Sequence, residues 1–489
     1  MLNADRAHNS TRRGEWWSSR AVMTATQKRR PAYRVVVNYL EQVIQSRGAH
    51  NDEPLPSVRA LCAQFNRSPP TIVRAYTDLE ARELIYAKPR RGYFVSSKAC
   101  RVLIEPGRNL LETVYTNARK PGVVPLSIDA PHYFSPLRHH ASDLNRTPAD
   151  IPHETLRGPS FAGSPPLRAA IAEIVLGRHY GYDDLFIVSS FQNALAAAIR
   201  SRCRGRKVLV ETPCTWAIPR VLDMLGLEAV EFDMRDDPDT LVARLAEACG
   251  QGDIALALVS SRMNQITGHL LDESTRRAIA TLFAQNQIHV VENASYADLC
   301  FVDTPRFHAL CGADNVTVVG GFSKTIGPEL GAAYIATREP PAELFTYIQF
   351  LPNKLSSDAQ ELLAGVLRSG EYDHAIGELN ERLMAHRDRM LAALARCLPA
   401  FQCAYDSPAG GAVIWVRMPE TIRADTLLRD VLAHCITIAP GNLFSVYGRF
   451  AHCLRLSYAT DWSLPVEQAI RTIGHCLDRR LHAASTRAG

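Results

Sequence analysis

Short, continuously apolar runs recur through the middle of the chain, each separated from the next by a helical pattern. They are "LFIVSS" (185–190), "KVLVETP" (207–213), "DIALALVSS" (253–261), "IHVVENASY" (288–296) and "VTVVGGFSK" (316–324). A strand with one face in water alternates apolar and polar residues, and these runs do not alternate. They therefore indicate a parallel sheet that is covered by helices on both faces, in an α/β domain.

Polar residues collect where these runs end. In α/β sheets, ligands bind beyond the carboxyl ends of the strands, so these ends predict the site. They carry Ser189, Ser190, residues 212–216, residues 264–268, Asn293, Tyr296, Ser323 and Lys324. A lysine placed directly after a strand can hold an aldehyde cofactor as a Schiff base. From the pattern alone, Lys324 is a catalyst, a cofactor anchor or a relic.

The N-terminal part of the chain is basic, although the whole chain has a net charge of only +5. Residues 1–98 hold 17 Lys and Arg against 8 Asp and Glu, a balance of +9, so the remainder balances to −4. This asymmetry favours a nucleic-acid-binding module joined to a different domain. A solvated basic surface is the alternative.

The spacing of apolar residues in the basic part predicts three helices and a β-hairpin. A helical pattern starts at Tyr33, Ser57 is placed to cap a second helix, and Pro69 occupies the first position of a third. The segment "LIYAKPRRGYFV" then gives two short β-runs around a basic turn. Together they predict a winged helix-turn-helix.

The exposed side of the third helix and the hairpin tip carry the expected DNA contacts. Arginines at the start of a recognition helix read the major groove, and those at a wing reach phosphates or the minor groove. The candidates are Ser57, Arg59, Arg67, Thr71, Arg74, Arg90 and Arg91.

The chain divides into four parts. We expect a polar, disordered leader at 1–30, the winged helix-turn-helix at 31–96, a linker at 97–155, and an effector and dimerisation domain at 156–480 that ends in a small α+β subdomain. The leader leaves open whether translation starts at Met1 or Met23. No apolar run reaches the ~18–20 residues of a membrane span. The closest cysteines are six apart, with no zinc-type spacing, so we expect no metal site.

Two stretches carry a resemblance to known families. "LPSVRALCAQFNRSPPTIVRAYTDLEARELIYAKPRRGYFV" closely resembles the DNA-binding domain of the GntR family of bacterial regulators. The order of strand ends from about 155 to 460 resembles the fold-type I aminotransferases, which use pyridoxal phosphate. The combination resembles the MocR-type transcriptional regulators. It implies a cytoplasmic homodimer that binds a double-stranded DNA operator and responds to a small effector.

The resemblance assigns roles to single residues. Lys324 matches the Schiff-base lysine, Tyr296 the tyrosine on the cofactor's phenolic oxygen, and Trp216 the ring that stacks on the pyridine. Arg455, in "LRLSYA", matches the arginine that grips a substrate carboxylate. Ser190 and Ser323 fall in the cofactor-binding region.

The departures from that family concern the cofactor. Asn293 stands where the family has the aspartate that pairs with the pyridine nitrogen. Gly321 replaces a residue with a hydroxyl, and Gly331 replaces the arginine that binds the phosphate. Losing these two hydrogen bonds to the phosphate removes roughly 3–6 kcal/mol of binding free energy. We expect no catalytic residue and no turnover, and weak pyridoxal phosphate binding through Lys324.

The sequence thus predicts a DNA-binding transcriptional regulator with a degenerate aminotransferase-like sensor domain. One alternative is an active aminotransferase with an attached DNA-binding domain. The other is a domain that serves only for dimerisation and DNA positioning.

Overall fold

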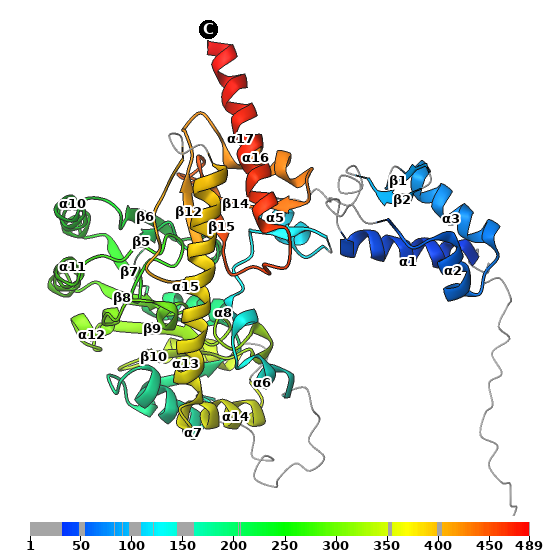
Figure 1. Ribbon diagram of the computed structural model, residues 1–489. Helices are drawn as coiled ribbons and strands as arrows, with labels where there is room; N and C mark the ends of the chain where they lie inside the picture. Colours follow the sequence, from blue (N-terminus) through cyan, green and yellow to red (C-terminus); the bar gives the residue numbers. More distant parts are fainter. Residues whose placement is uncertain are drawn as a thin grey trace, which may run out of the picture.

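Figure 1 shows the computed structural model of the chain. The structure describes residues 32–47, 54–82, 84–89, 91–96, 109–120, 122–143, 161–203, 205, 207–350, 355–398 and 403–488. The leader expected at 1–30 lies outside them. Among the described residues, no helix combines the length and apolar character that a membrane span requires.

The N-terminal domain is a winged helix-turn-helix. Ser57 begins the second helix by accepting a hydrogen bond from the Ala60 N–H at 3.1 Å, and Asn66, at φ 50°, ends it in the left-handed region. Tyr76 is fully buried, and its ring stacks on that of Tyr93 at 4.2 Å. The elements are α1 (Ala32–Arg47), α2 (Val58–Phe65), α3 (Pro69–Ala81), β1 (Ile85–Lys88) and β2 (Gly92–Val95). The predicted three helices and hairpin are confirmed.

The large domain is built on a seven-stranded sheet in the order β4-β10-β9-β8-β7-β5-β6. Its strands are β4 (Leu185–Val188), β5 (Lys207–Thr212), β6 (Glu228–Asp233), β7 (Ile254–Ser260), β8 (His289–Asn293), β9 (Val316–Gly321) and β10 (Ala333–Thr337). Strands β5 to β9 are parallel, as the apolar runs predict for β5, β7, β8 and β9, whereas β10 is antiparallel to both β9 and β4. Only residues 322–332 join β9 to β10, which is too short for the helical crossover that a parallel pair needs.

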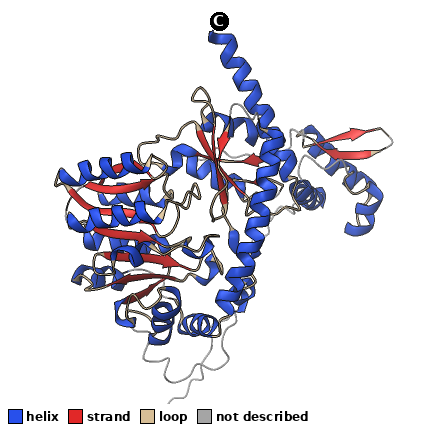
Figure 2. Ribbon diagram, turned by 60° about the vertical axis from the view of Figure 1, so that its left-hand side comes forward, coloured by secondary structure: helices blue, strands red, loops and turns tan. Residues whose placement is uncertain are grey.

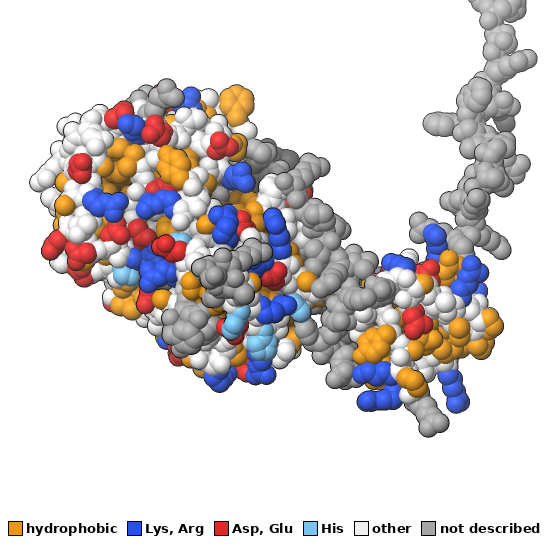
Figure 3. All heavy atoms as spheres, turned by 90° about the horizontal axis from the view of Figure 1, so that it is seen from above, with side chains coloured by type: hydrophobic (Ala, Val, Ile, Leu, Met, Phe, Trp, Pro, Cys, Tyr) orange, Lys and Arg blue, Asp and Glu red, His pale blue; other side chains and the backbone are white. Residues whose placement is uncertain are grey.

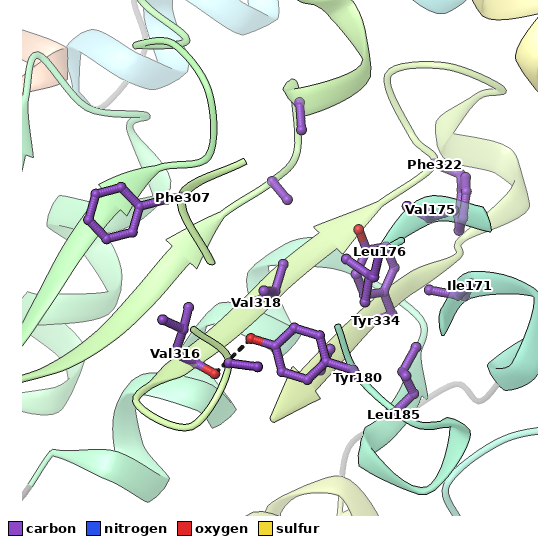
Figure 4. Close-up of a cluster of buried hydrophobic side chains, with 14 of the residues drawn as sticks. Ile171, Val175, Leu176, Tyr180, Leu185, Phe307, Val316, Val318, Phe322 and Tyr334 are labelled. Atoms are coloured by element: carbon purple, nitrogen blue, oxygen red, sulfur yellow. Dashed lines mark hydrogen bonds between the residues drawn. The ribbon is translucent and has the colours of Figure 1, made fainter. Parts of the chain in front are cut away.

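Helices cover both faces of this sheet (Figure 2). Alternate strand residues belong to different cores: Leu209 and Val290 face one, Val208 and Val291 the other. The first face packs against α7 (Pro165–Ala170), α10 (Pro238–Gly250), α11 (Glu273–Gln285), α12 (Phe307–Cys311) and α14 (Ser357–Arg368). The second packs against α8 (Phe191–Arg202), α9 (Ala217–Leu225) and α13 (Ala342–Phe350). Figure 4 shows part of the first core, where the Tyr180 hydroxyl donates to the Val316 carbonyl at 3.0 Å.

The small domain follows a long helix, α15 (Glu371–Cys397), whose first turns pack in the large core and whose later turns pack in the small one. The small sheet has the order β11-β12-β15-β14 and is antiparallel. The elements of the small domain are β11 (Ala404–Tyr405), β12 (Val413–Arg417), α16 (Ala424–Leu432), β13 (Ile436–Thr437), β14 (Ala439–Pro440), β15 (Cys453–Ser457) and α17 (Val466–Ala488).

The linker that the sequence predicts at 97–155 is in large part folded into the body. Val114 and Leu126 are fully buried in the small-domain core, and Leu137 is fully buried in the large one. The strand in this segment pairs in parallel with β13, which lies more than 300 residues later. The elements are α5 (Leu110–Ala118), β3 (Val124–Pro125), η1 (Pro131–Phe134) and α6 (Arg138–Asp143). We call residues 109–143 the threading segment.

Candidate functional site

Lys324 lies just beyond the carboxyl end of β9, in the turn after Phe322 and Ser323. Its ammonium donates to the Asp129 carbonyl at 2.9 Å and to the Asp129 carboxylate at 3.1 Å. The Lys324 side chain is 26% exposed and that of Asp129 15%. Lys324 is therefore paired with Asp129, a residue of the threading segment. The sequence analysis assigned no role to Asp129.

Two more side chains converge on the same carboxylate. The Tyr296 hydroxyl, just after β8, donates to Asp129 Oδ2. The Arg455 guanidinium, on β15, lies 3.4 Å from Asp129 Oδ1 and donates to the Ser127 carbonyl at 2.6 Å. The structure thus brings together Lys324, Tyr296 and Arg455, as the resemblance implies. They surround the Asp129 carboxylate of the same chain.

The charges at this point are tightly coupled. Burial alone would raise the pKa of Asp129, but the neighbouring Arg455 and Lys324 cations outweigh it and hold that pKa well below its usual range. Burial and the Asp129 carboxylate raise the pKa of Tyr296 well above its ordinary value. Asp129 therefore stays ionised and Tyr296 stays protonated near neutral pH.

A second residue of the threading segment reaches the site. Tyr115, on α5, lies beside the Arg455 guanidinium. Burial raises the pKa of Tyr115, and the neighbouring guanidinium opposes this only in part. Its ring centroid is 6.1 Å from that of Trp216, at an interplanar angle of 60°. Trp216 lies half-buried at the start of α9, and the ring beside it is that of Tyr115 of the same chain.

Asn293, at the end of β8, is 8% exposed and bonded locally. Its side-chain oxygen accepts from the Ser295 N–H at 3.1 Å and the Ser295 hydroxyl at 2.7 Å. That hydroxyl also lies 3.0 Å from Gln265 Oε1. A cavity of about 10 Å³ beside Asn293 and Cys214 has room for about one water molecule. The Asn293 amide supplies no negative charge to a pyridine nitrogen, and the Glu211 carboxyl that lines the same cavity accepts hydrogen bonds from the Ser260 N–H and the Asn264 side-chain amide.

The positions expected to hold a phosphate give it little. The Ser190 hydroxyl caps α8 by accepting from the Asn193 N–H at 3.2 Å. A Cβ at Gly321 would lie 3.0 Å from the Ala332 carbonyl oxygen, so a hydroxyl-bearing residue fits there only if the backbone shifts. Gly331 has φ +58°, in the left-handed region that side chains disfavour.

The residues present do not fit a resident pyridoxal phosphate. The amine that would bind the aldehyde is held by Asp129, and the Tyr296 hydroxyl is engaged by the same carboxylate. Gly321 and Gly331 offer no side chain to the phosphate. We therefore derive no chemistry through this cofactor.

The winged helix presents the expected basic residues to solvent. Arg59, near the start of α2, and Arg67 and Arg74, before and within α3, are exposed, and Thr71 is half-buried with its hydroxyl 3.0 Å from that of Ser68. The Arg74 guanidinium lies 4.5 Å from the Tyr33 ring centroid, which orients it. In Figure 3, Lys and Arg side chains line two edges of this domain, with apolar side chains between them.

The other predicted contacts lie at the cap and the wing. Ser57 is exposed, and its hydroxyl is used to cap α2. Arg91 is exposed beside β2, with its guanidinium 5.9 Å from the Phe94 ring centroid. Arg90 lies outside the described residues.

A winged helix joined to an α/β body with a lysine after β9 defines a class of two-domain proteins. The family model for bacterial regulatory proteins of the gntR family matches residues 32–95, and that for aminotransferase class I and II matches residues 121–473. The chain therefore belongs to the aminotransferase class I and II family and, with its GntR-family domain, is a transcriptional regulator of the MocR type. The fold implies pyridoxal phosphate binding in the family.

Individual relatives agree with this assignment. The chain is 25% identical over 473 residues to the HTH-type transcriptional regulator YjiR of Escherichia coli K12, covering 92% of this chain and 99% of the relative. It is 25% identical over 368 residues to the 2-aminoadipate transaminase of Thermus thermophilus, covering 73% and 91%. The crystal structure of a multiple substrate aminotransferase from Thermococcus profundus matches with a TM-score of 0.66 at 20% identity, covering 78% and 98%. That likeness shows the fold.

Proposed function

We propose that the protein regulates transcription by binding an operator through α3 and the wing, as a homodimer whose aminotransferase-like domain senses a small carboxylate. The observation that carries the DNA-binding part is the pair of exposed arginines Arg67 and Arg74, before and within α3, on a domain whose core is complete without them. Because its target is bacterial DNA, we place its action in the cytoplasm.

The DNA contacts are tested by comparing arginines of the same small domain. We expect Arg74→Ala to lower specific affinity by about 1–3 kcal/mol, because it removes a base contact. Arg59→Ala should weaken all sequences about equally and flatten the salt dependence, because it removes a phosphate contact.

Arg82 supplies a matched control at the other end of α3. It is ion-paired with Glu41 at 2.6 Å and with Asp78 at 3.3 Å, so its charge is already engaged. We expect Arg82→Ala to leave specific binding nearly unchanged. Gel-shift titrations at several salt concentrations measure all three variants, and equal binding by wild type, Arg59→Ala and Arg74→Ala would contradict the proposed interface.

We propose that the aminotransferase-like domain does not catalyse transamination. Lys324, Tyr296 and Arg455 are present, which is what favours the alternative of an active enzyme, but Asp129 engages all three. Purified protein should convert no amino donor to its keto acid in the presence of pyridoxal phosphate. Turnover that Lys324→Ala abolishes would establish the enzyme instead.

We propose the homodimer because the family builds its site at a subunit interface and because two winged helices suit a two-part operator. Light scattering at micromolar concentration should give about twice the chain mass of 54.1 kDa. A monomer under those conditions would remove this part of the proposal.

A further inference from the structure

The Asp129 carboxylate occupies the point where the site's cationic groups converge. One oxygen faces Lys324 and Tyr296, and the other faces Arg455. This is the arrangement that an external carboxylate would adopt between an ammonium, a phenol and a guanidinium. The chain therefore fills its own carboxylate-binding position.

The backbone on the N-terminal side of Asp129 is fixed on the small domain. The Leu126 carbonyl accepts from the Ser457 N–H at 2.7 Å, and the Ser127 hydroxyl donates to the Thr437 hydroxyl at 2.8 Å. Both contacts are buried. The position of Asp129 is thus built into the fold rather than reached by a long, swinging side chain.

The cluster is nonetheless not saturated, as a purely structural ion pair would be. Among the described residues, both cations form their ion pairs with Asp129 alone, so two positive charges face one negative charge. Arg455 is 2% exposed, and its Nε has no hydrogen-bond partner. A buried guanidinium with an unused donor marks a place where a further acceptor would be favourable.

We propose that Asp129 is a built-in carboxylate ligand of this site, and that a small external carboxylic acid competes with it for Lys324 and Arg455. The proposal rests on the sensing role proposed above and specifies its ligand class. Asp129 then determines the concentration at which the external acid is bound. The threading segment that carries Asp129 follows the DNA-binding domain in the chain, with only residues 96–108 between β2 and Asn109. Displacement of the Asp129 side chain therefore removes the contacts to Lys324, Tyr296 and Arg455 that help to hold this segment in the body.

Trapping with glyoxylate and borohydride tests whether Asp129 holds the site. Glyoxylate carries a carboxylate for Arg455 and an aldehyde for Lys324. The lysine amine adds to the aldehyde carbon with loss of water, and borohydride reduces the resulting imine to a stable secondary amine that peptide mass mapping locates. The reaction uses the full-length protein and no DNA, so its outcome is independent of operator binding.

We expect little labelling of Lys324 in the wild type and about 10- to 100-fold more in Asp129→Ala, because one charge-assisted contact no longer holds the amine. Sodium acetate should suppress the increase in Lys324 labelling in Asp129→Ala, whereas sodium chloride at the same ionic strength should not. Lys207 serves as the internal reference. It lies outside this site, and its ammonium is ion-paired with Asp253 at 2.8 Å. Asp129→Asn, which keeps the shape without the charge, should give an intermediate result and replaces Asp129→Ala if that variant does not fold.

Two results would overturn the proposal. Equal labelling of Lys324 in the wild type and in the folded variant would show that Asp129 does not hold the site. Labelling that rises in the variant but is unaffected by acetate would show that the emptied position does not accept an external carboxylate.

Discussion

The contact between Asp129 and Arg455 can be measured as a coupling free energy. The perturbation is a double-mutant cycle of Asp129→Asn, Arg455→Met and the double variant. Methionine keeps much of the apolar volume over the Phe444 ring, on which the guanidinium carbon lies at 4.8 Å. Each single variant leaves a buried charge with a weakened set of partners, whereas the double variant removes both.

The magnitude follows from the geometry. Two unit charges at the observed 3.4 Å attract each other by about 5 kcal/mol at an effective dielectric of about 20. Because the desolvation of both groups opposes this attraction, we expect a coupling of about 1–3 kcal/mol. The double variant should therefore be more stable than the sum of the single effects predicts.

Urea denaturation followed by tryptophan fluorescence gives the four free energies of unfolding. The matched control is the Arg480–Asp430 pair, at 2.5 Å but with both side chains about one-third exposed. Its cycle should give below about 1 kcal/mol because solvent screens it. Additivity within about 0.5 kcal/mol at Asp129 and Arg455 would refute the placement of Asp129 against the guanidinium.

Three further predictions follow from the described contacts. Gly331→Arg should destabilise the body by about 1–2 kcal/mol, because a side chain at φ +58° is strained, and thermal melting measures this. The pKa of Asp129 is lowered by folding, so its contribution is complete above the ordinary pKa of 3.8 and is lost as the pH falls toward the lower folded value. The difference in melting temperature between wild type and Asp129→Asn should therefore shrink from pH 5 to pH 3. A difference that stays the same over this range would contradict the pairing of the Asp129 carboxylate with Lys324 and Arg455. Tyr76→Phe should destabilise the winged helix by about 1 kcal/mol, because the hydroxyl donates to the Pro56 carbonyl, and hydrogen exchange in α3 would show it.

The parts of the fold that local pattern determines could be predicted from the sequence. The continuous apolar runs predict β4, β5, β7, β8 and β9, because a strand buried on both faces has no polar alternation. The edge strand β6 has no such run and was not predicted. Lys324 and Tyr296 follow such runs directly, so their place beyond the carboxyl ends of neighbouring strands could be inferred. Ser57 and Pro69 likewise mark the starts of α2 and α3.

Asp129 and Tyr115 could not be predicted in this way. Both lie in a weakly patterned segment with several Pro and Gly residues, and local composition there indicates a linker. Their position depends on pairing between β3 and β13, two strands of two residues each that are distant in sequence. Such short strands have no detectable period, so only the tertiary structure shows that the segment enters the site.

If occupancy of the site by Asp129 is linked to DNA binding, operator affinity depends on Asp129, and one titration tests this directly. Fluorescence anisotropy would give the affinity of wild type and Asp129→Ala for an operator selected in vitro, with and without acetate. We predict that Asp129→Ala changes operator affinity by about fivefold or more, as expected for two coupled sites. Acetate should move the wild type toward the affinity of the variant, because it displaces Asp129, and should leave the variant nearly unchanged. Equal affinities for the two proteins, both with and without acetate, would contradict the claim.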